Sequence, residues 1–173
     1  MFAPLALTAA CLASVAALLV ADRQGSAAWR ILAKLSASTF FVLVAVSLDA
    51  QGSSYGQFVL GALMLGWVGD ALLLSQTPQA FMIGLVAFLL SHLLFAAAFV
   101  SGPLRVPAMA VAGLLAALIC AVVLRWLLPH TPANFKAPVV AYVVVILGMC
   151  IAAAGHAFAD ARFAALAGAL LFA

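Results

Sequence analysis

Seven apolar runs, separated by short polar connections, constrain this chain more than any other feature of its sequence. A helix needs about 20 mainly apolar residues to cross the hydrocarbon core of a membrane, and most of the runs approach that length. They cover Pro4–Ala21, Ile31–Leu48, Gln57–Ser75, Phe81–Val100, Pro103–Leu127, Pro138–Ala154 and Phe163–Ala173. The pattern predicts an all-α, polytopic transmembrane helix bundle with about seven spans, in a single transmembrane domain covering residues 1–173.

Composition excludes a soluble globular domain and a nucleic-acid-binding protein. Hydrophobic residues make up 69% of the chain and charged residues 6%, whereas soluble domains carry roughly 25% charged residues. The basic residues lie singly near helix ends and form no basic patch, so we expect membrane lipids and no nucleic acid as partners. The three cysteines show no CxxC spacing and nothing resembles a nucleotide-binding loop, so we expect no disulfide framework, metal or cofactor.

The basic residues predict the orientation of the chain in the membrane, because short cytoplasmic loops carry an excess of Lys and Arg. If consecutive spans alternate in direction, Arg105 and Arg162 fall on one side. The larger set falls on the other side and comprises Arg23, Arg30, Lys34, Arg125 and Lys136. We therefore expect an N-terminus outside the cytoplasm and, in a bacterium, a location in the inner membrane.

The last apolar run is too short to span a membrane. Phe163–Ala173 provides 11 residues, which form about 16 Å of helix, roughly half of the hydrocarbon thickness. It ends without a cap, an anchoring aromatic residue or a basic residue. Either the sequence is truncated, which we expect, or the last helix ends inside the protein.

Two ionisable residues stand out inside the apolar stretch Gly61–Val100, namely Asp70 and His92. An ionisable group within hydrocarbon costs at least about 2.5–3.5 kcal/mol on insertion scales, so it needs a partner, a cavity or a function. The predicted topology places Asp70 in the cytoplasmic half of the membrane and His92 near its middle. Other polar residues share the depth of Asp70, and an inward-facing cluster is the least costly arrangement for them; they are Lys34, Arg125, Tyr142 and Lys136.

Structural alternatives exist for most of these residues. Asp70 and Lys34 could form an ion pair that only stabilises the fold, and His92 could donate an interhelical hydrogen bond. Arg125 could be an anchor whose side chain snorkels to the interface, and Tyr142 could belong to an interfacial aromatic belt.

Three further polar residues are expected to be structural. His156 and Asp160 are four residues apart near the predicted outer face, where we expect a solvated pair at a helix end. Asp49 lies in a polar connection and is predicted to be a turn residue.

The sequence resembles the YhhN family, the lysoplasmalogenase-like membrane proteins, over nearly its whole length. The resemblance rests on an early lysine, a Gly-Asp pair followed by leucines, an F-x-x-G-L-x-x-F-x-x-x-H segment and a late G-A-x-L-F segment. The residues concerned are Lys34, Gly69, Asp70, Leu72, Leu73, Phe81, Gly84, Leu85, Phe88, His92, Tyr142, Met149 and Gly168–Phe172. The resemblance implies about eight transmembrane helices, with a Ser-Asp pair after the late segment that this sequence does not reach.

The resemblance also implies a function, the hydrolysis of the vinyl ether bond of lysoplasmalogens by an alkenylglycerophosphocholine or alkenylglycerophosphoethanolamine hydrolase. The expected substrate is a lysophospholipid, and the products are a fatty aldehyde and a glycerophospho-headgroup. We expect Asp70 to be the catalytic acid and base, with His92 and Tyr142 orienting it or its water. Lys34, Arg125 and Lys136 would bind the phosphate, since cations suit that task.

An alternative from a different class is a small proton-coupled transporter, or a lipid-binding membrane protein, that uses Asp70 and His92 as a proton relay. Transporters often contain helices interrupted by Gly or Pro in corresponding halves of the chain. No such pair of half-helices is visible in this sequence, which favours the hydrolase.

Overall fold

The fold is entirely helical within the described residues, as the sequence predicts. The computed structural model describes residues 2–75, 77–160 and 163–173, so Arg162 of the predicted topology lies outside the described residues. These ranges contain no β-strand, and the all-α class is confirmed. The helices are α1 (Phe2–Arg23), α2 (Ala27–Ser47), α3 (Ser54–Leu72), α4 (Pro78–Val100), α5 (Val106–Leu127), α6 (Lys136–Asp160) and α7 (Phe163–Phe172), with short 3₁₀ turns at Ala50–Gly52, Leu128–His130 and Ala133–Phe135.

The observed helices differ from the predicted runs by a few residues at several ends and by most at the end of α6. The differences at α5 and α6 have a local cause. Helix α5 begins at Val106 and not at Pro103, because Arg105 is extended and Pro107 occupies the first turn, where a missing N–H costs nothing. Helix α6 continues past Ala154 to Asp160. Gly155 lies within this extension among alanines, which are the strongest helix formers, and does not stop the helix.

Several helices are suited to cross a membrane. By length and composition, five helices could cross a membrane: Ala3–Arg23, Ala27–Ser47, Pro78–Val100, Val106–His130 and Lys136–Ala159. Helix α3 has 19 residues and α7 has ten, and neither is among the five. The chain is therefore a multi-pass membrane protein, while the side on which its N-terminus lies stays a prediction.

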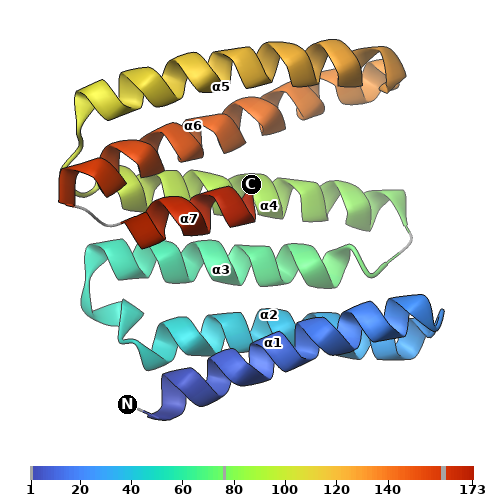
Figure 1. Cartoon of the computed structure of the whole chain (residues 1–173). Helices are drawn as coiled ribbons and strands as arrows, with labels where there is room; N and C mark the ends of the chain where they lie inside the picture. The colour runs from blue at the N-terminus through green and yellow to red at the C-terminus, as the bar shows by residue number, and fades with distance from the viewer. Residues whose placement is uncertain (1, 76, 161–162) are drawn as a thin grey trace. The chain divides into compact units, whose positions relative to one another are not determined.

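The chain divides into two compact units, Met1–Ser91 and His92–Ala173, and the boundary falls within α4. The prediction of a single transmembrane domain stays a prediction. In the first unit, α1, α2, α3 and the first part of α4 follow one another in antiparallel order (Figure 1). Helix α2 packs against both α1 and α3. Ala33 and Ala37 are buried in α2, and the Cys11 thiol of α1 donates a weak hydrogen bond to the Ala37 carbonyl at 3.5 Å. Small residues allow helix backbones to approach closely.

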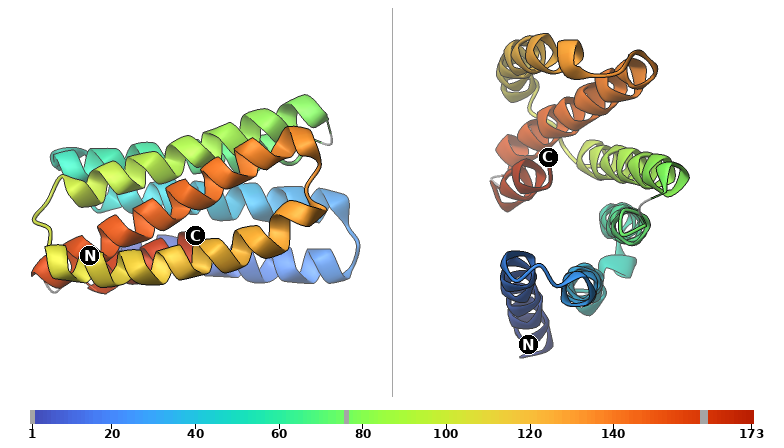
Figure 2. Two further views of the ribbon diagram at one scale, coloured as in Figure 1. Left: turned by 90° about the horizontal axis from the view of Figure 1, so that it is seen from above. Right: turned by 90° about the vertical axis from the view of Figure 1, so that its right-hand side faces the viewer.

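The second unit contains the end of α4 together with α5, α6 and α7. Helices α5 and α6 are inclined to each other and meet where α5 begins and α6 ends (Figure 2). At this point the Arg105 N–H donates a hydrogen bond to the Gly155 carbonyl at 3.0 Å. Helix α7 folds back against α6.

His156 occupies a buried position that the sequence analysis did not predict. Its side chain is 2% exposed within α6, and its ring centroid lies 6.2 Å from that of Phe99. Gly102 makes room for the imidazole, since a Cβ there would lie 2.6 Å from His156 Cε1. The prediction of a solvated His156 at a helix end is therefore wrong, and the side chain of Asp160 lies outside the described residues.

Asp49 is confirmed as a turn residue. It adopts a positive φ of 55° immediately before the 3₁₀ turn Ala50–Gly52, a conformation that Asn and Asp tolerate better than most residues. The turn brings the Ala50 carbonyl against the first turn of α3, where a Cβ on Gly56 would lie 2.1 Å from the Ala50 oxygen.

We predict that Gly56→Ala lowers the midpoint of thermal unfolding in detergent. The added methyl group meets backbone atoms, which cannot move aside as a flexible side chain would. Gly113→Ala is the matched control, because a Cβ at Gly113 meets nothing within 4 Å and alanine gains up to about 1 kcal/mol of helix propensity over glycine. Equal midpoints for the two variants would contradict this account of the turn.

Candidate functional site

Asp70 lies in the last turn of α3 and is bound by two side chains of α2. The Lys34 Nζ lies 3.1 Å from Asp70 Oδ1, and the Ser38 hydroxyl donates a hydrogen bond to Asp70 Oδ2. Residues four apart lie on one face of an α-helix, so the side chains of Lys34 and Ser38 both reach the Asp70 carboxylate. Within the described residues, these two groups are the recorded polar partners of Asp70.

The ion pair is neither fully buried nor fully solvated. The exposed fractions of the Lys34 and Asp70 side chains are 30% and 24%. A partly desolvated setting strengthens the attraction between the charges over its value in water. Asp70 also lies where the free carbonyl groups of a helix C-terminus carry partial negative charge, so its carboxylate depends strongly on Lys34 for stabilisation.

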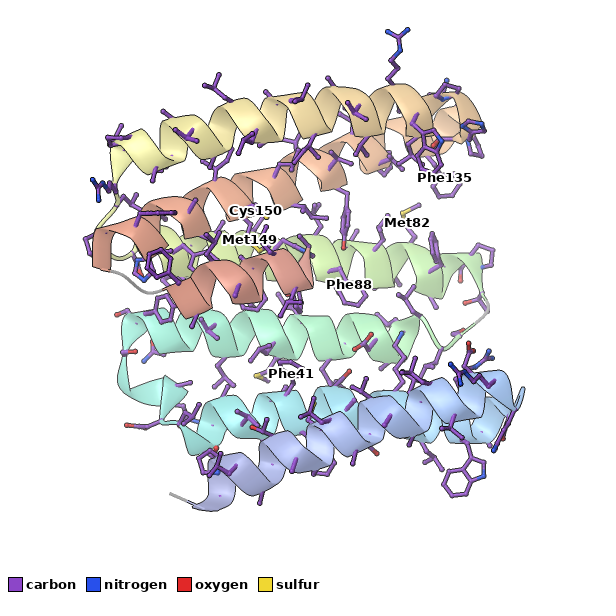
Figure 3. All side chains as sticks on the ribbon, viewed as in Figure 1. Phe41, Met82, Phe88, Phe135, Met149 and Cys150 are labelled. Atoms are coloured by element: carbon purple, nitrogen blue, oxygen red, sulfur yellow. The ribbon has the colours of Figure 1, made fainter. Side chains whose placement is uncertain are left out.

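Glycines let α4 approach α3 beside the carboxylate. Phe88 points from α4 toward α3 (Figure 3), and a Cβ on Gly69 would lie 2.7 Å from its ring. On α4, a Cβ on Gly84 would lie 3.4 Å from the Gly69 carbonyl oxygen. The apolar ring of Phe88 thus packs next to the residue that precedes Asp70.

A second polar contact fixes the position of α3 along α2. The Trp67 indole N–H donates to the Thr39 hydroxyl at 3.0 Å, and the Thr39 hydroxyl donates to the Leu35 carbonyl at 2.7 Å. Trp67 is one turn before Asp70, and Thr39 follows Ser38 directly. Two neighbouring polar contacts therefore hold the same pair of helix turns together.

His92 is the centre of an aromatic cluster in the second unit. Its side chain is 2% exposed, and its ring centroid lies 5.4 Å from that of Tyr142 and 5.1 Å from that of Phe172. The Phe172 ring also lies 4.8 Å from the Phe95 ring. The end of α7 thus packs on the same turns of α4 that carry His92.

Arg125 and Lys136 lie at the two ends of the connection between α5 and α6. Arg125 is in the last turn of α5 and Lys136 is the first residue of α6, and both are exposed. Neither forms an ion pair within the parts of the chain that the structure describes. Their side chains are accessible to an anionic group.

The structure brings four of the predicted residues together in two pairs. Lys34 contacts Asp70 in the first unit, and His92 contacts Tyr142 in the second. The prediction that all six residues form one cluster stays a prediction. Sequence analysis missed Ser38, although its position four residues after Lys34 places it on the same face of the helix as that lysine.

An apolar groove of about 900 Å³ lies in the second unit along α5, α6 and α7. Arg105 is the charged residue of its lining, and none of the six predicted site residues lines it. Among the described residues, no group of three His, Cys, Asp or Glu side chains could hold a metal ion. The chemical groups of the candidate site are therefore those around Asp70 and His92.

Comparisons with known proteins match the part of the chain that carries the candidate site. The sequence profile of the YhhN family matches residues 29–173, a range that contains all six predicted site residues. The lysoplasmalogenase TMEM86B of Rattus norvegicus is 37% identical over 97 residues, which cover 56% of this chain and 39% of that protein. The match thus spans about two fifths of the relative's length. No solved structure matches the chain.

We predict that a double-mutant cycle of Lys34→Met and Asp70→Asn gives a coupling energy of about 1–3 kcal/mol, between the values typical of exposed and buried pairs. The exposed pair Arg30–Asp22 is the matched control, with an N–O distance of 3.5 Å and exposed fractions of 51% and 67%. Its coupling should stay below about 1 kcal/mol. Reversible unfolding in mixed micelles measures both cycles. Equal coupling energies would contradict the assignment of a stronger interaction to Lys34–Asp70 than to Arg30–Asp22.

Proposed function

Because the chain belongs to the YhhN family, we propose that it is a membrane hydrolase that cleaves the vinyl ether bond of lysoplasmalogens. The observation that carries the proposal is the Lys34–Asp70 pair, an acidic and a cationic group side by side on apolar helices. The partial similarity to a lysoplasmalogenase supports this substrate class. A lysophospholipid reaches such a site from the membrane itself.

The chemistry of a vinyl ether defines what the site must supply. An acid protonates the β-carbon of the double bond, which produces an oxocarbenium ion. Water then attacks the cation, and the proton that this water loses returns to the base. The resulting hemiacetal collapses to a fatty aldehyde and the free hydroxyl of the glycerophospho-headgroup. One group that serves first as acid and then as base is therefore sufficient.

Asp70 is the group that we assign to this cycle. As an acid it donates a proton to the β-carbon, and as a carboxylate it stabilises the cation and accepts a proton from water. The partly apolar surroundings of Asp70 suit its role beside the cation, because a low local dielectric strengthens the attraction between opposite charges. Lys34 supplies the charge that a phosphate requires.

Arg125 and Lys136 are proposed to assist in binding the headgroup, since both are exposed cations at helix ends. His92 and Tyr142 are proposed to orient Asp70 or its water. Their rings are in edge-to-face contact, with centroids 5.4 Å apart, and packed rings are suited to orienting a small reactant.

We predict that Asp70→Asn lowers kcat for aldehyde release from a lysoplasmalogen by about 10²–10⁴-fold, the usual contribution of a positioned acid or base. The substitution keeps the shape of the side chain and removes its proton chemistry. Asp49→Asn is the matched control and should retain activity, because Asn tolerates the positive φ at that turn. Equal rates for wild type and Asp70→Asn would exclude Asp70 as the acid. A wild-type protein that releases no aldehyde would instead favour a transporter or lipid-binding protein.

We predict that Tyr142→Phe lowers kcat about tenfold and leaves KM nearly unchanged. The variant loses the hydroxyl group that is proposed to orient Asp70 or its water, but its ring still packs against His92. Tyr55→Phe is the control, since Tyr55 lies at the opposite end of α3 from Asp70. The aldehyde-release assay with full saturation curves measures both constants. An unchanged kcat in Tyr142→Phe would restrict Tyr142 to packing.

A further inference from the structure

The Ser38 hydroxyl is directed differently from three other hydroxyl groups of α1 and α2. Thr8, Ser14 and Thr39 each donate a hydrogen bond to the carbonyl four residues earlier in the same helix, which is a common bond of Ser and Thr inside helices. Ser38 instead donates across to α3, where it binds Asp70 Oδ2. Its recorded bond therefore holds the carboxylate and not the backbone of α2.

Lys34 and Ser38 hold the two oxygens of Asp70 separately. The Lys34 ammonium lies 3.1 Å from Oδ1, and the Ser38 hydroxyl binds Oδ2. The χ2 torsion of aspartate sets the plane of the carboxylate, and its energy wells are broad, so the torsion is weakly restricted by itself. One donor on each oxygen, both from one face of α2, restricts this torsion and therefore sets the plane of the carboxylate.

Ser38 is the more directional of the two donors. Lysine carries a compact charge on a flexible four-carbon stem, so its ammonium can follow a carboxylate that turns. Serine carries its hydroxyl oxygen on a single carbon, so the position of this oxygen changes only with the χ1 rotamer. A carboxylate has about four lone-pair positions, so Asp70 can accept a further hydrogen bond from a reactant while both donors are bound.

Another contact joins the same two helices independently of Ser38. The Trp67 indole N–H of α3 donates to the Thr39 hydroxyl of α2, and the ion pair between Lys34 and Asp70 does not involve Ser38 either. Removal of the Ser38 hydroxyl should therefore change the orientation of the carboxylate more than it changes the association of α2 with α3.

We propose that Ser38 is a positioning residue that fixes the plane of the Asp70 carboxyl group for the acid–base cycle. This inference rests on the proposed function, in which Asp70 protonates the β-carbon and later takes a proton from water. Both transfers need an oxygen of Asp70 within reach of the reacting atom, and a displacement of about 1 Å can cost about 10²-fold in rate. Ser38 acts through Asp70 and is not itself a catalytic group.

Saturation kinetics of aldehyde release from a lysoplasmalogen by the purified full chain test the proposal. Ser38→Ala should lower kcat about tenfold and leave KM nearly unchanged, because the carboxyl group is less well aimed while the contacts that bind the substrate stay. Ser38→Thr keeps the hydroxyl and should recover most of the lost kcat. Ser36→Ala is the control, because Ser36 is exposed on the same helix, and its kcat should equal that of wild type. Equal kcat values for the alanine and threonine variants of Ser38 would overturn the proposal.

Thr39→Val separates positioning from helix packing. It removes the bond to Trp67 between the same helix turns and leaves both partners of Asp70 in place. Its midpoint of thermal unfolding in detergent should fall at least as far as that of Ser38→Ala, whereas its kcat should fall less. If kcat follows the midpoint equally in both variants, Ser38 only joins the helices and the proposal is wrong.

Infrared difference spectroscopy of the chain labelled with isotopic aspartate reads the same contact without turnover. The carboxylate stretching bands that disappear in Asp70→Asn should shift in Ser38→Ala and keep their wild-type positions in Ser36→Ala. Unshifted bands in Ser38→Ala would overturn the proposal. An active wild type with an unchanged kcat in Ser38→Ala would overturn the positioning role alone. A wild type that releases no aldehyde would instead overturn the proposed function, and the positioning role with it.

Discussion

A carboxylate near the end of an apolar helix is tolerated only with a partner, and this requirement organises the first half of the chain. Asp70 meets it with the Lys34 ammonium and the Ser38 hydroxyl, both presented by α2. The free energy that an isolated charge would cost within hydrocarbon greatly exceeds that of a surface ion pair. The contact consequently fixes the position of α3 along α2, and the neighbouring bond between Trp67 and Thr39 fixes the same turns.

Small residues allow the apolar surroundings to close around this polar contact. Ala33 and Ala37 are the buried residues of α2, and Gly69 and Gly84 let α4 approach α3. Membrane helices gain little from hydrophobic association, so close backbone packing and a few polar contacts carry much of the specificity. The result is a partly buried carboxylate that lies between apolar helices and is held by the Lys34 ammonium and the Ser38 hydroxyl.

Much of this arrangement could be predicted from the sequence, since length and hydropathy determine membrane helices almost by themselves. The C-terminal ends of α2 and α4 follow the predicted runs closely. The ion pair joins Lys34 and Asp70, two residues that the sequence predicts at a common depth. Ser38 escaped notice because a serine in an apolar helix carries no insertion penalty that demands a partner. The prediction for His156 fails because the predicted apolar run ends at Ala154, whereas α6 continues to Asp160 and Gly102 in another connection leaves the space that buries the imidazole. Such pairwise fits between distant residues leave no trace in a local pattern.

The central claim is that the Lys34–Asp70 pair performs chemistry and does not only stabilise the fold. Exchanging the two residues, Lys34→Asp together with Asp70→Lys, tests it most directly, because the exchange restores an ion pair but moves the carboxylate from α3 to α2. Unfolding midpoints and aldehyde release are measured for the exchange and for each single variant. We expect the exchanged protein to recover most of the stability lost in the single variants and to release no aldehyde from a lysoplasmalogen. Recovery of aldehyde release together with stability would show that the pair is structural and would contradict the account.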